Sequence, residues 1–193
     1  MKGRWLVLLF CVQVSTVFGW GSKEVFSHYP NKYFVETGTY RGEGVRKALS
    51  AGFKDVYSIE LSPYYYKLCV GMFAKQKNVH LYFGDSAKEL VTIIQQLNAP
   101  ITFWLDGHCS MGNTARGDTM TPLMKELEAI KRHPIKTHTI LIDDVRQFGT
   151  ADFDWLSKDE VIKKIMEINP SYTIKYEDGY RPKDVLVAYI DTK

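Results

Sequence analysis

The chain of 193 residues has few cysteines, and they do not provide a disulfide framework. Only three are present, and Cys11 lies in an N-terminal segment that we expect to be removed. Cys69 falls on the apolar side of a helical pattern, which favours a core position, whereas Cys109 falls in a polar loop. Internal repeats and low-complexity runs are also absent. These absences favour one globular domain with a hydrophobic core.

Long hydrophobic runs are missing except near the N-terminus. Lys2 and Arg4 precede an apolar stretch from Trp5 to Val14, and Gly19 offers a small residue for cleavage. This pattern predicts a signal peptide over residues 1–19 and a single domain over residues 20–193, in the secretory pathway or outside the cell. A short membrane anchor and a buried N-terminal helix are the alternatives, although a bilayer span needs about 20 apolar residues.

The chain also lacks a large excess of one charge. It has 25 basic and 22 acidic residues. The predicted signal contains two of the basic residues and no acidic one, so 23 and 22 remain and the net charge of the mature chain is +1. This balance gives no basic footprint for nucleic acid. We therefore expect a small-molecule partner, and no membrane contact after signal removal; the oligomeric state stays open.

Short apolar runs alternate with helical patterns from residue 33 onward, which indicates an α/β fold with a parallel sheet. Between the last two runs, residues 177–184 leave no room for a helix, so this pair must be antiparallel. The prediction is a Rossmann-like, doubly wound, mostly parallel seven-stranded sheet with a C-terminal antiparallel hairpin. Its expected strands are Tyr33–Val35, Val56–Ile59, Val79–Phe83, Ile101–Leu105, Thr139–Ile142, Tyr172–Tyr176 and Val185–Ile190.

Helix start signals stand between these strands. Two capping boxes are expected, one from Ser86 with Glu89 and one from Ser157 with Glu160. Proline after a polar residue marks two further starts, at residues 62–63 and 121–122.

Acidic residues follow the expected strands at the edge where such sheets bind ligands. One acid there is explained as well by a helix cap, but a group of like charges in one crevice costs stability and points to a ligand. We expect a carboxylate at the end of the second strand to accept ribose hydroxyls and those after the third strand to contact adenine, although Ser86 also has a capping role. The acids are Glu36, Glu60, Asp85, Asp106, Asp143 and Asp144.

The turn after the first strand lacks the glycines of a dinucleotide-binding fingerprint. Counting from Gly38, that fingerprint needs glycine where Tyr40 and Glu43 stand, and no Gly-Lys-Ser/Thr of a phosphate-binding loop follows. A nucleotide-dependent oxidoreductase is therefore disfavoured. The carboxylate of Glu36 suits a ligand with an ammonium and a sulfonium group better than a pyrophosphate.

With Glu36, the glycine turn, Glu60, Asp85 and the terminal hairpin in this order, the chain resembles the class I S-adenosylmethionine-dependent methyltransferases over roughly residues 30 to 190. The resemblance implies that this cofactor binds along the same edge. The turn would line its methionine part, Glu60 its ribose, and the residues after the third strand its adenine. The implied cofactor residues are Glu36, Gly38, Tyr40, Gly42, Glu60, Asp85 and Ser86.

An acid after the fourth strand and an acid pair after the fifth resemble the pattern of metal-dependent O-methyltransferases, which implies Mg²⁺ held by Asp106, Asp143 and Asp144. Such an ion lowers the pKa of an acceptor hydroxyl. The alternative is that the Asp pair only caps local turns. We expect O-methylation of a small hydroxylated acceptor.

The segment Leu105-Asp106-Gly107-His108 is similar to one in uncharacterised methyltransferase-like proteins, where an aromatic residue stands in place of Cys109. This difference argues against Cys109 as a nucleophile. Asp106 and His108 are the catalytic candidates, with His108 as general base, metal ligand or loop-ordering side chain.

Residues 108–120 form an expected substrate loop, in which Asn113 and Arg116 are candidates for binding the acceptor. A secretory compartment offers little S-adenosylmethionine, so a non-catalytic secreted ligand-binding protein is the second hypothesis.

Overall fold

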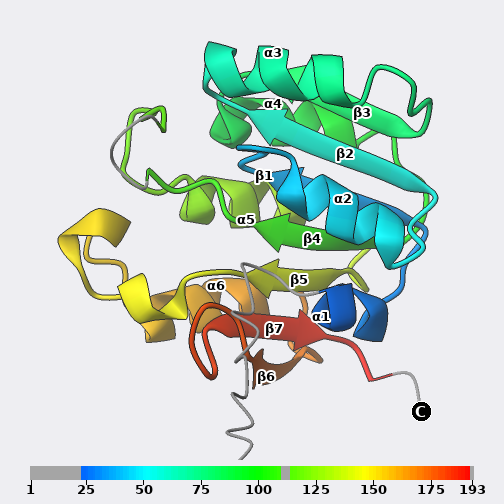
Figure 1. Ribbon diagram of the computed structural model, residues 1–193. Coiled ribbons are helices and arrows are strands. Elements are labelled where there is room, and N and C mark those ends of the chain that lie inside the picture. The colour runs from blue at the N-terminus through cyan, green and yellow to red at the C-terminus, as the bar shows by residue number, and fades with distance from the viewer. Residues whose placement is uncertain (1–22, 110–113, 192–193) are drawn as a thin grey trace, which may run out of the picture.

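The computed structural model describes residues 23–109 and 114–191 (Figure 1). The predicted signal peptide, Cys11 and Asn113 therefore lie outside the described residues. Within the described ranges the chain forms one seven-stranded sheet with helices on both faces. None of the helices in these ranges is long and apolar enough to cross a membrane.

The elements follow the expected alternation. The strands are β1 (Tyr33–Thr37), β2 (Asp55–Glu60), β3 (Val79–Phe83), β4 (Ile101–Leu105), β5 (Thr139–Ile142), β6 (Thr173–Glu177) and β7 (Val185–Tyr189). The helices are α1 (Lys23–His28), α2 (Glu43–Ser50), α3 (Pro63–Met72), α4 (Ser86–Ile94), α5 (Leu123–Arg132) and α6 (Lys158–Ile168), with short 3₁₀ helices η1 (Val145–Gln147) and η2 (Ala151–Phe153).

The strand order is β3-β2-β1-β4-β5-β7-β6. The first five strands are parallel, and β7 runs antiparallel to both β5 and β6, which confirms the predicted sheet and hairpin. The chain reverses its direction of winding between β1 and β4, which are neighbours. In an open α/β sheet, this reversal leaves a crevice beyond the carboxyl ends of the strands.

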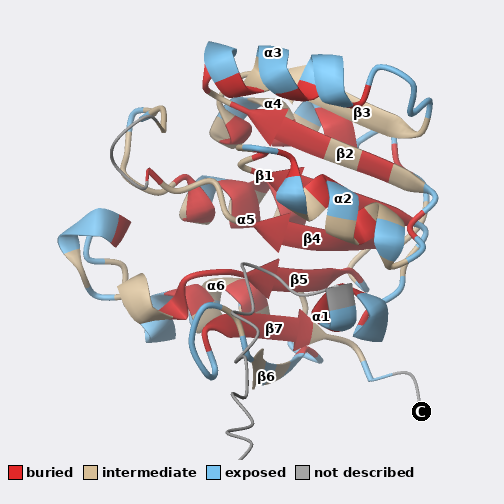
Figure 2. Ribbon diagram, in the orientation of Figure 1, coloured by how far each residue is buried: buried red, intermediate tan, exposed pale blue. Residues whose placement is uncertain are grey.

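The burial of the central strands explains why the sequence predicted them. Every residue of β1, β4 and β5 is buried, so these strands are apolar on most consecutive positions (Figure 2). One core cluster includes Leu90 and Leu127 from α4 and α5, and the other includes Val45 and Cys69 from α2 and α3. The core position of Cys69 is thus confirmed.

One of the two expected capping boxes is present and the other is not. Ser157 and Glu160 form theirs at the start of α6. At α4 the cap is Asp85, whose Oδ1 accepts the Ala87 N–H at 3.0 Å. Ser86 is already the first helical residue, and its hydroxyl donates to a different side chain, Glu126. The capping role expected for Ser86 is therefore wrong, because the preceding aspartate supplies the cap.

Candidate active site

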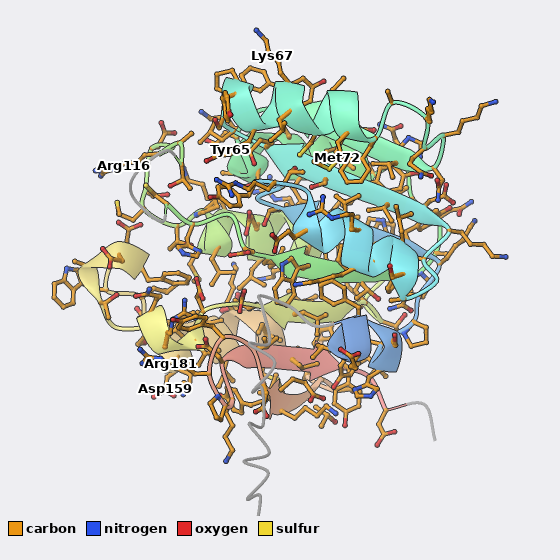
Figure 3. All side chains as sticks on the ribbon, in the orientation of Figure 1. Tyr65, Lys67, Met72, Arg116, Asp159 and Arg181 are labelled. Atoms are coloured by element: carbon orange, nitrogen blue, oxygen red, sulfur yellow. The ribbon has the colours of Figure 1, made fainter. Side chains whose placement is uncertain are left out.

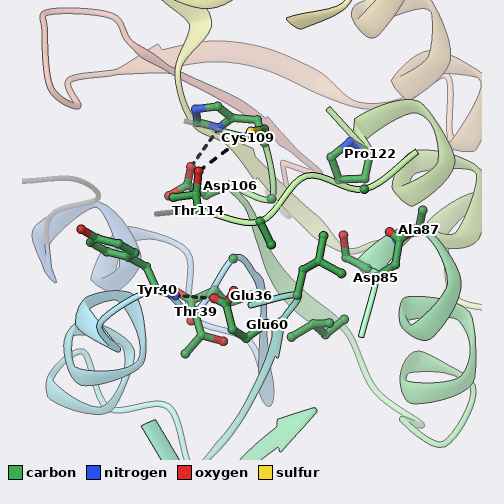
Figure 4. A pocket seen from close by; sticks show the side chains of 18 of the residues that line it. Glu36, Thr39, Tyr40, Glu60, Asp85, Ala87, Asp106, Cys109, Thr114 and Pro122 are labelled. Carbon is green, nitrogen blue, oxygen red and sulfur yellow. Dashed lines mark hydrogen bonds and ion pairs between the residues drawn. The ribbon is translucent and has the colours of Figure 1, made fainter. Parts of the chain in front are cut away.

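A cavity of about 400 Å³ lies at the carboxyl ends of β1, β2, β3 and β4 (Figure 4). Its volume is in the range of small-molecule sites. Among the predicted site residues, those lining it are Glu36, Gly38, Tyr40, Glu60, Asp85, Ser86, Asp106 and His108. The structure thus brings the expected cofactor residues to one place, apart from Gly42.

The turn after β1 needs glycine at two positions for different reasons. At Gly38, with φ 84°, a Cβ would lie 2.4 Å from the backbone oxygen of Asp106, so the turn packs directly on the chain after β4. At Gly42, with φ 73°, a Cβ would lie 2.6 Å from the ring of Phe73. Gly42 thus allows α3 to pack closely and does not line the cavity, contrary to the expected ligand contact.

Glu36 belongs to β1, and its carboxyl lies against the start of α2. Its side chain is 2% exposed, and Ser58 Oγ donates to its Oε2 at 2.5 Å. A Cβ on Gly44 would be only 1.7 Å from Oε1, so the carboxyl occupies the space above the second residue of α2. Burial raises the pKa of Glu36 to about 8, against the lowering effect of the Ser58 hydrogen bond. A bound cation would favour the ionised form.

We expect this raised pKa to produce a pH dependence of folding. The folded protein holds the Glu36 proton up to about pH 8, whereas the unfolded chain releases it near pH 4.5. The free energy of unfolding should therefore fall as the pH rises from about 4.5 to about 8, and Glu36 contributes at most about 1.4 kcal/mol per pH unit to this fall. Urea unfolding of wild type and Glu36→Gln across this range measures the contribution. Parallel pH profiles for the two proteins would contradict it.

Glu60 lines the cavity, and backbone N–H groups fix the position of its carboxylate. The backbone N–H groups of Tyr40 and Ser62 donate to its two oxygens, each at 2.7 Å. Burial raises the pKa of Glu60, and these amide hydrogen bonds act in the opposite direction. The carboxylate lines the cavity, and its oxygens can accept ligand hydroxyls beside these N–H donors. The geometry therefore suits bidentate acceptance from a diol.

A buried acid that the sequence analysis missed lies beneath the α4 side of the cavity. Glu126 of α5 is 1% exposed and accepts the Ser86 hydroxyl at 2.6 Å. Burial raises its pKa to about 7. The missed signal is its position among Leu123, Leu127 and Ile130, on the apolar face of α5. An acid on such a face needs a buried partner, and the partner is the Ser86 hydroxyl that was expected to contact adenine.

The second half of the site is a network of charged side chains after β4 and β5. His108 Nδ1 lies 3.4 Å from Asp106 Oδ1, and His108 Nε2 lies 2.9 Å from Asp144 Oδ2. Burial alone would lower the pKa of His108, but the hydrogen bonds and charges of these two carboxylates raise it to about 10. His108 then carries a proton on both nitrogens at neutral pH. This arrangement does not suit a general base and favours the role of an ordering side chain.

Arg146 and Asp184 complete this network, and neither was a sequence candidate. The Arg146 guanidinium pairs with Asp144 and Asp184, and its backbone N–H donates to Asp184 Oδ1 at 3.0 Å. Asp184 escaped notice because it precedes a strand. Since β7 is antiparallel, its first residue lies at the edge where the parallel strands end. Knowing the direction of the last strand could have identified Asp184.

The donors in this region do not match the expected metal site. Potential ligand atoms come within 4.8 Å of one another in two groups, Asp106–His108–Asp144 and Asp143–Asp144–Asp184. Among the described residues, the expected set of Asp106, Asp143 and Asp144 is not such a group, and the Asp pair does not line the cavity. Both groups share Asp144, which already pairs with two basic side chains. These contacts fit Mg²⁺ poorly, since that ion needs several available oxygens.

Described residues between β4 and α5, on either side of residues 110–113, line one wall of the cavity. Cys109 is buried in the cavity wall, and its N–H donates to Met120 O at 2.8 Å. Asp154 Oδ2 accepts the N–H groups of Met120 and Thr121 at 2.8 and 3.0 Å, which fastens the end of the loop. Arg116 is exposed and does not line the cavity; Figure 3 shows it on the outside of the loop.

No protein-family model matches the chain, and no curated protein sequence matches it. Solved structures do. A candidate rRNA methylase from Clostridium thermocellum has a TM-score of 0.58 at 11% identity, over 86% of this chain and 92% of that one. The O-methyltransferase from Bacillus cereus, in complex with S-adenosylhomocysteine (SAH), has a TM-score of 0.55 at 14% identity, over 88% and 78%.

An SAH-bound methyltransferase from Podospora anserina has a TM-score of 0.52 at 16% identity, over 84% of this chain and 73% of that one. At these identities the likeness concerns the arrangement of the backbone. The chain therefore has the fold of the S-adenosylmethionine-dependent methyltransferases.

Proposed function

We propose that the chain is an S-adenosylmethionine-dependent methyltransferase that methylates a hydroxyl group of a small acceptor. The observation that most strongly supports this proposal is the position of the Glu36 carboxyl. In dinucleotide-binding folds, the N-terminus of the first helix after β1 receives a pyrophosphate. Here the carboxyl of Glu36 fills the space at the start of α2 that a phosphate would need, and it would ionise beside a bound cation. S-adenosylmethionine has an ammonium and a sulfonium group and no phosphate.

The residues of the cavity fit the parts of this cofactor in order. Glu36 would bind the ammonium group and Glu60 the ribose hydroxyls, and the start of α4 beside Asp85 would border the adenine. S-adenosylmethionine, when bound, supplies an electrophilic methyl group. The protein would hold the cofactor and exclude water with the turn after β1 and with residues 114–120, all of which line the same cavity except Arg116.

The acceptor would enter on the side of Asp106, which lies between the cofactor residues and the network around Asp144. Asp106 lines the cavity, and burial raises its pKa, whereas its hydrogen bond with His108 acts in the opposite direction. A carboxylate there can accept the proton that an acceptor hydroxyl loses. We therefore propose that Asp106 accepts this proton and that His108 orients the Asp106 carboxyl. No step is assigned to a metal ion, because the donors fit one poorly.

Thermal unfolding of the chain without residues 1–19 tests the cofactor assignment. At 100 times its dissociation constant, S-adenosylmethionine should stabilise the fold by about 2.7 kcal/mol. For a chain of this size that corresponds to a rise in Tm of roughly 5 to 10 °C. NAD⁺ is the matched control and should give no shift. A shift with NAD⁺ and none with S-adenosylmethionine would favour the oxidoreductase hypothesis.

A non-catalytic secreted binding protein is the second candidate, and residues 1–19 are the observation that favours it. We propose that these residues direct the chain into the secretory pathway. Tracking the full chain and a chain without residues 1–19 in cells tests this address. Cofactor binding without methyl transfer to any member of a panel of hydroxylated acceptors would support the binding protein.

A further inference from the structure

The network after β4 and β5 contains two basic side chains, Arg146 and His108. The Arg146 guanidinium lies between Asp144 and Asp184. Its Cζ also lies over the ring of Tyr180, 5.0 Å from the ring centroid. The side chain of Asp184 is 1% exposed and that of Asp144 is 10% exposed. Charge pairs with this little solvent attract more strongly than pairs on a protein surface. Arg146 is thus a fixed positive charge inside the acid cluster.

His108 is the second basic side chain in the cluster. Its imidazole bridges Asp106 and Asp144, and its ring packs against Phe153 with a centroid distance of 5.1 Å. The His108 side chain is 6% exposed. This packing and the two carboxylate contacts hold the His108 ring between the ends of β4 and β5.

The oxygens of Asp144 and Asp184 that a metal ion would need are already in use. Asp144 Oδ1 faces Arg146, and Asp144 Oδ2 faces His108 Nε2 at 2.9 Å. Asp184 Oδ1 accepts the backbone N–H of Arg146, and Asp184 Oδ2 faces its guanidinium. A divalent ion here would have to displace these donors and lie beside a guanidinium that cannot lose its proton.

We propose that Arg146, together with His108, takes the place of a divalent metal ion in this cluster, so that the acceptor side of the site works without bound metal. The inference deepens the proposed function and rests on it. Arg146 acts through Asp144 and does not line the cavity, so it is a positioning residue. It balances the buried carboxylates and holds Asp144, which in turn holds His108 against Asp106.

Titration of the purified protein with Mn²⁺, followed by electron paramagnetic resonance, tests this proposal without any cofactor. Wild type should bind no Mn²⁺ at this cluster up to millimolar concentration. Arg146→Met should create one Mn²⁺ site, at least about tenfold tighter than any in wild type, because it frees oxygens of Asp144 and Asp184. Arg181→Met is the matched control, since Arg181 is an exposed arginine in the connection between β6 and β7, close in the chain to Asp184, and it should behave as wild type.

Two results would overturn the proposal. One is a single Mn²⁺ site in wild type that disappears in Asp144→Asn. The other is a folded Arg146→Met that binds no more Mn²⁺ than wild type. If Arg146→Met does not fold, His108→Asn serves as the second variant, because it frees the other oxygen of Asp144, and the wild-type titration stays decisive. Binding of S-adenosylmethionine, measured separately with and without chelator, distinguishes a failure here from a failure of the proposed function.

Discussion

Glu60→Gln is expected to weaken S-adenosylmethionine binding at least about 100-fold, which corresponds to about 2.7 kcal/mol. The two Glu60 oxygens are oriented by the N–H groups of Tyr40 and Ser62, and Glu60 lines the cavity. Hydrogen bonds to a charged acceptor contribute about 1.5–3 kcal/mol each, and a ribose diol would make two. Glutamine loses the charge and places an amide NH₂ against a backbone N–H. Isothermal titration calorimetry measures the loss.

The control for this change is Glu43→Gln. Glu43 also lines the cavity but is exposed, and it is the first residue of α2. The Glu43→Gln substitution removes the same charge from the same cavity but leaves the predicted ribose contact intact. Cofactor binding should therefore change by less than about threefold. Equal losses in the two variants would show that only overall charge matters. Unchanged binding in Glu60→Gln would place the cofactor elsewhere.

Gly44→Ala is expected to destabilise the fold and to weaken cofactor binding at the same time. The added Cβ would lie 1.7 Å from Glu36 Oε1, so the carboxyl must leave its position above α2. Overpacking of this kind costs roughly 1–3 kcal/mol. The displaced carboxyl would also lose its hydrogen bond from Ser58 and its aim at the ammonium group. Urea unfolding and calorimetry on the same samples measure both effects.

Gly71→Ala is the matched helical control. Gly71 lies within α3, where a Cβ would meet nothing within 4 Å. Alanine there should stabilise the protein by up to about 1 kcal/mol through helix propensity, with cofactor binding unchanged. If Gly44→Ala behaved in the same way as Gly71→Ala, Glu36 would not be held at the start of α2, and the main argument against a pyrophosphate ligand would fail.

Much of the fold was predictable because each strand is a short run with a clear burial pattern. The bounds of β3, β4 and β5 agree with the expected ranges, and the other strands differ by one or two residues. The hairpin was predictable from the short connection before β7, which leaves no room for a crossover helix. Helix α1 and the 3₁₀ helices η1 and η2 were not predicted, since short helices have little periodicity to detect.

The candidate site was predictable where a residue's place depends on its own strand. Glu36, Glu60 and Asp106 each follow or end a strand, so their convergence needs only a parallel sheet. Ser86 was misread because a capping box is a local pattern, and its hydroxyl instead meets Glu126, 40 residues away in the chain. Arg146 and Asp184 were missed for a similar reason, because they meet across 38 residues.

By itself, the sequence determined the order of helices and strands, the antiparallel end of the sheet, and the acids that gather at its ligand-binding edge. These features follow from local burial patterns and connection lengths. Only the tertiary structure decided how those acids are partnered: Glu36 with Ser58 above α2, Ser86 with Glu126, and Asp144 with His108 and Arg146. The physical reason is that the properties of a buried carboxylate depend on the donors and charges within a few ångströms of it, and in this fold those neighbours come from distant parts of the chain.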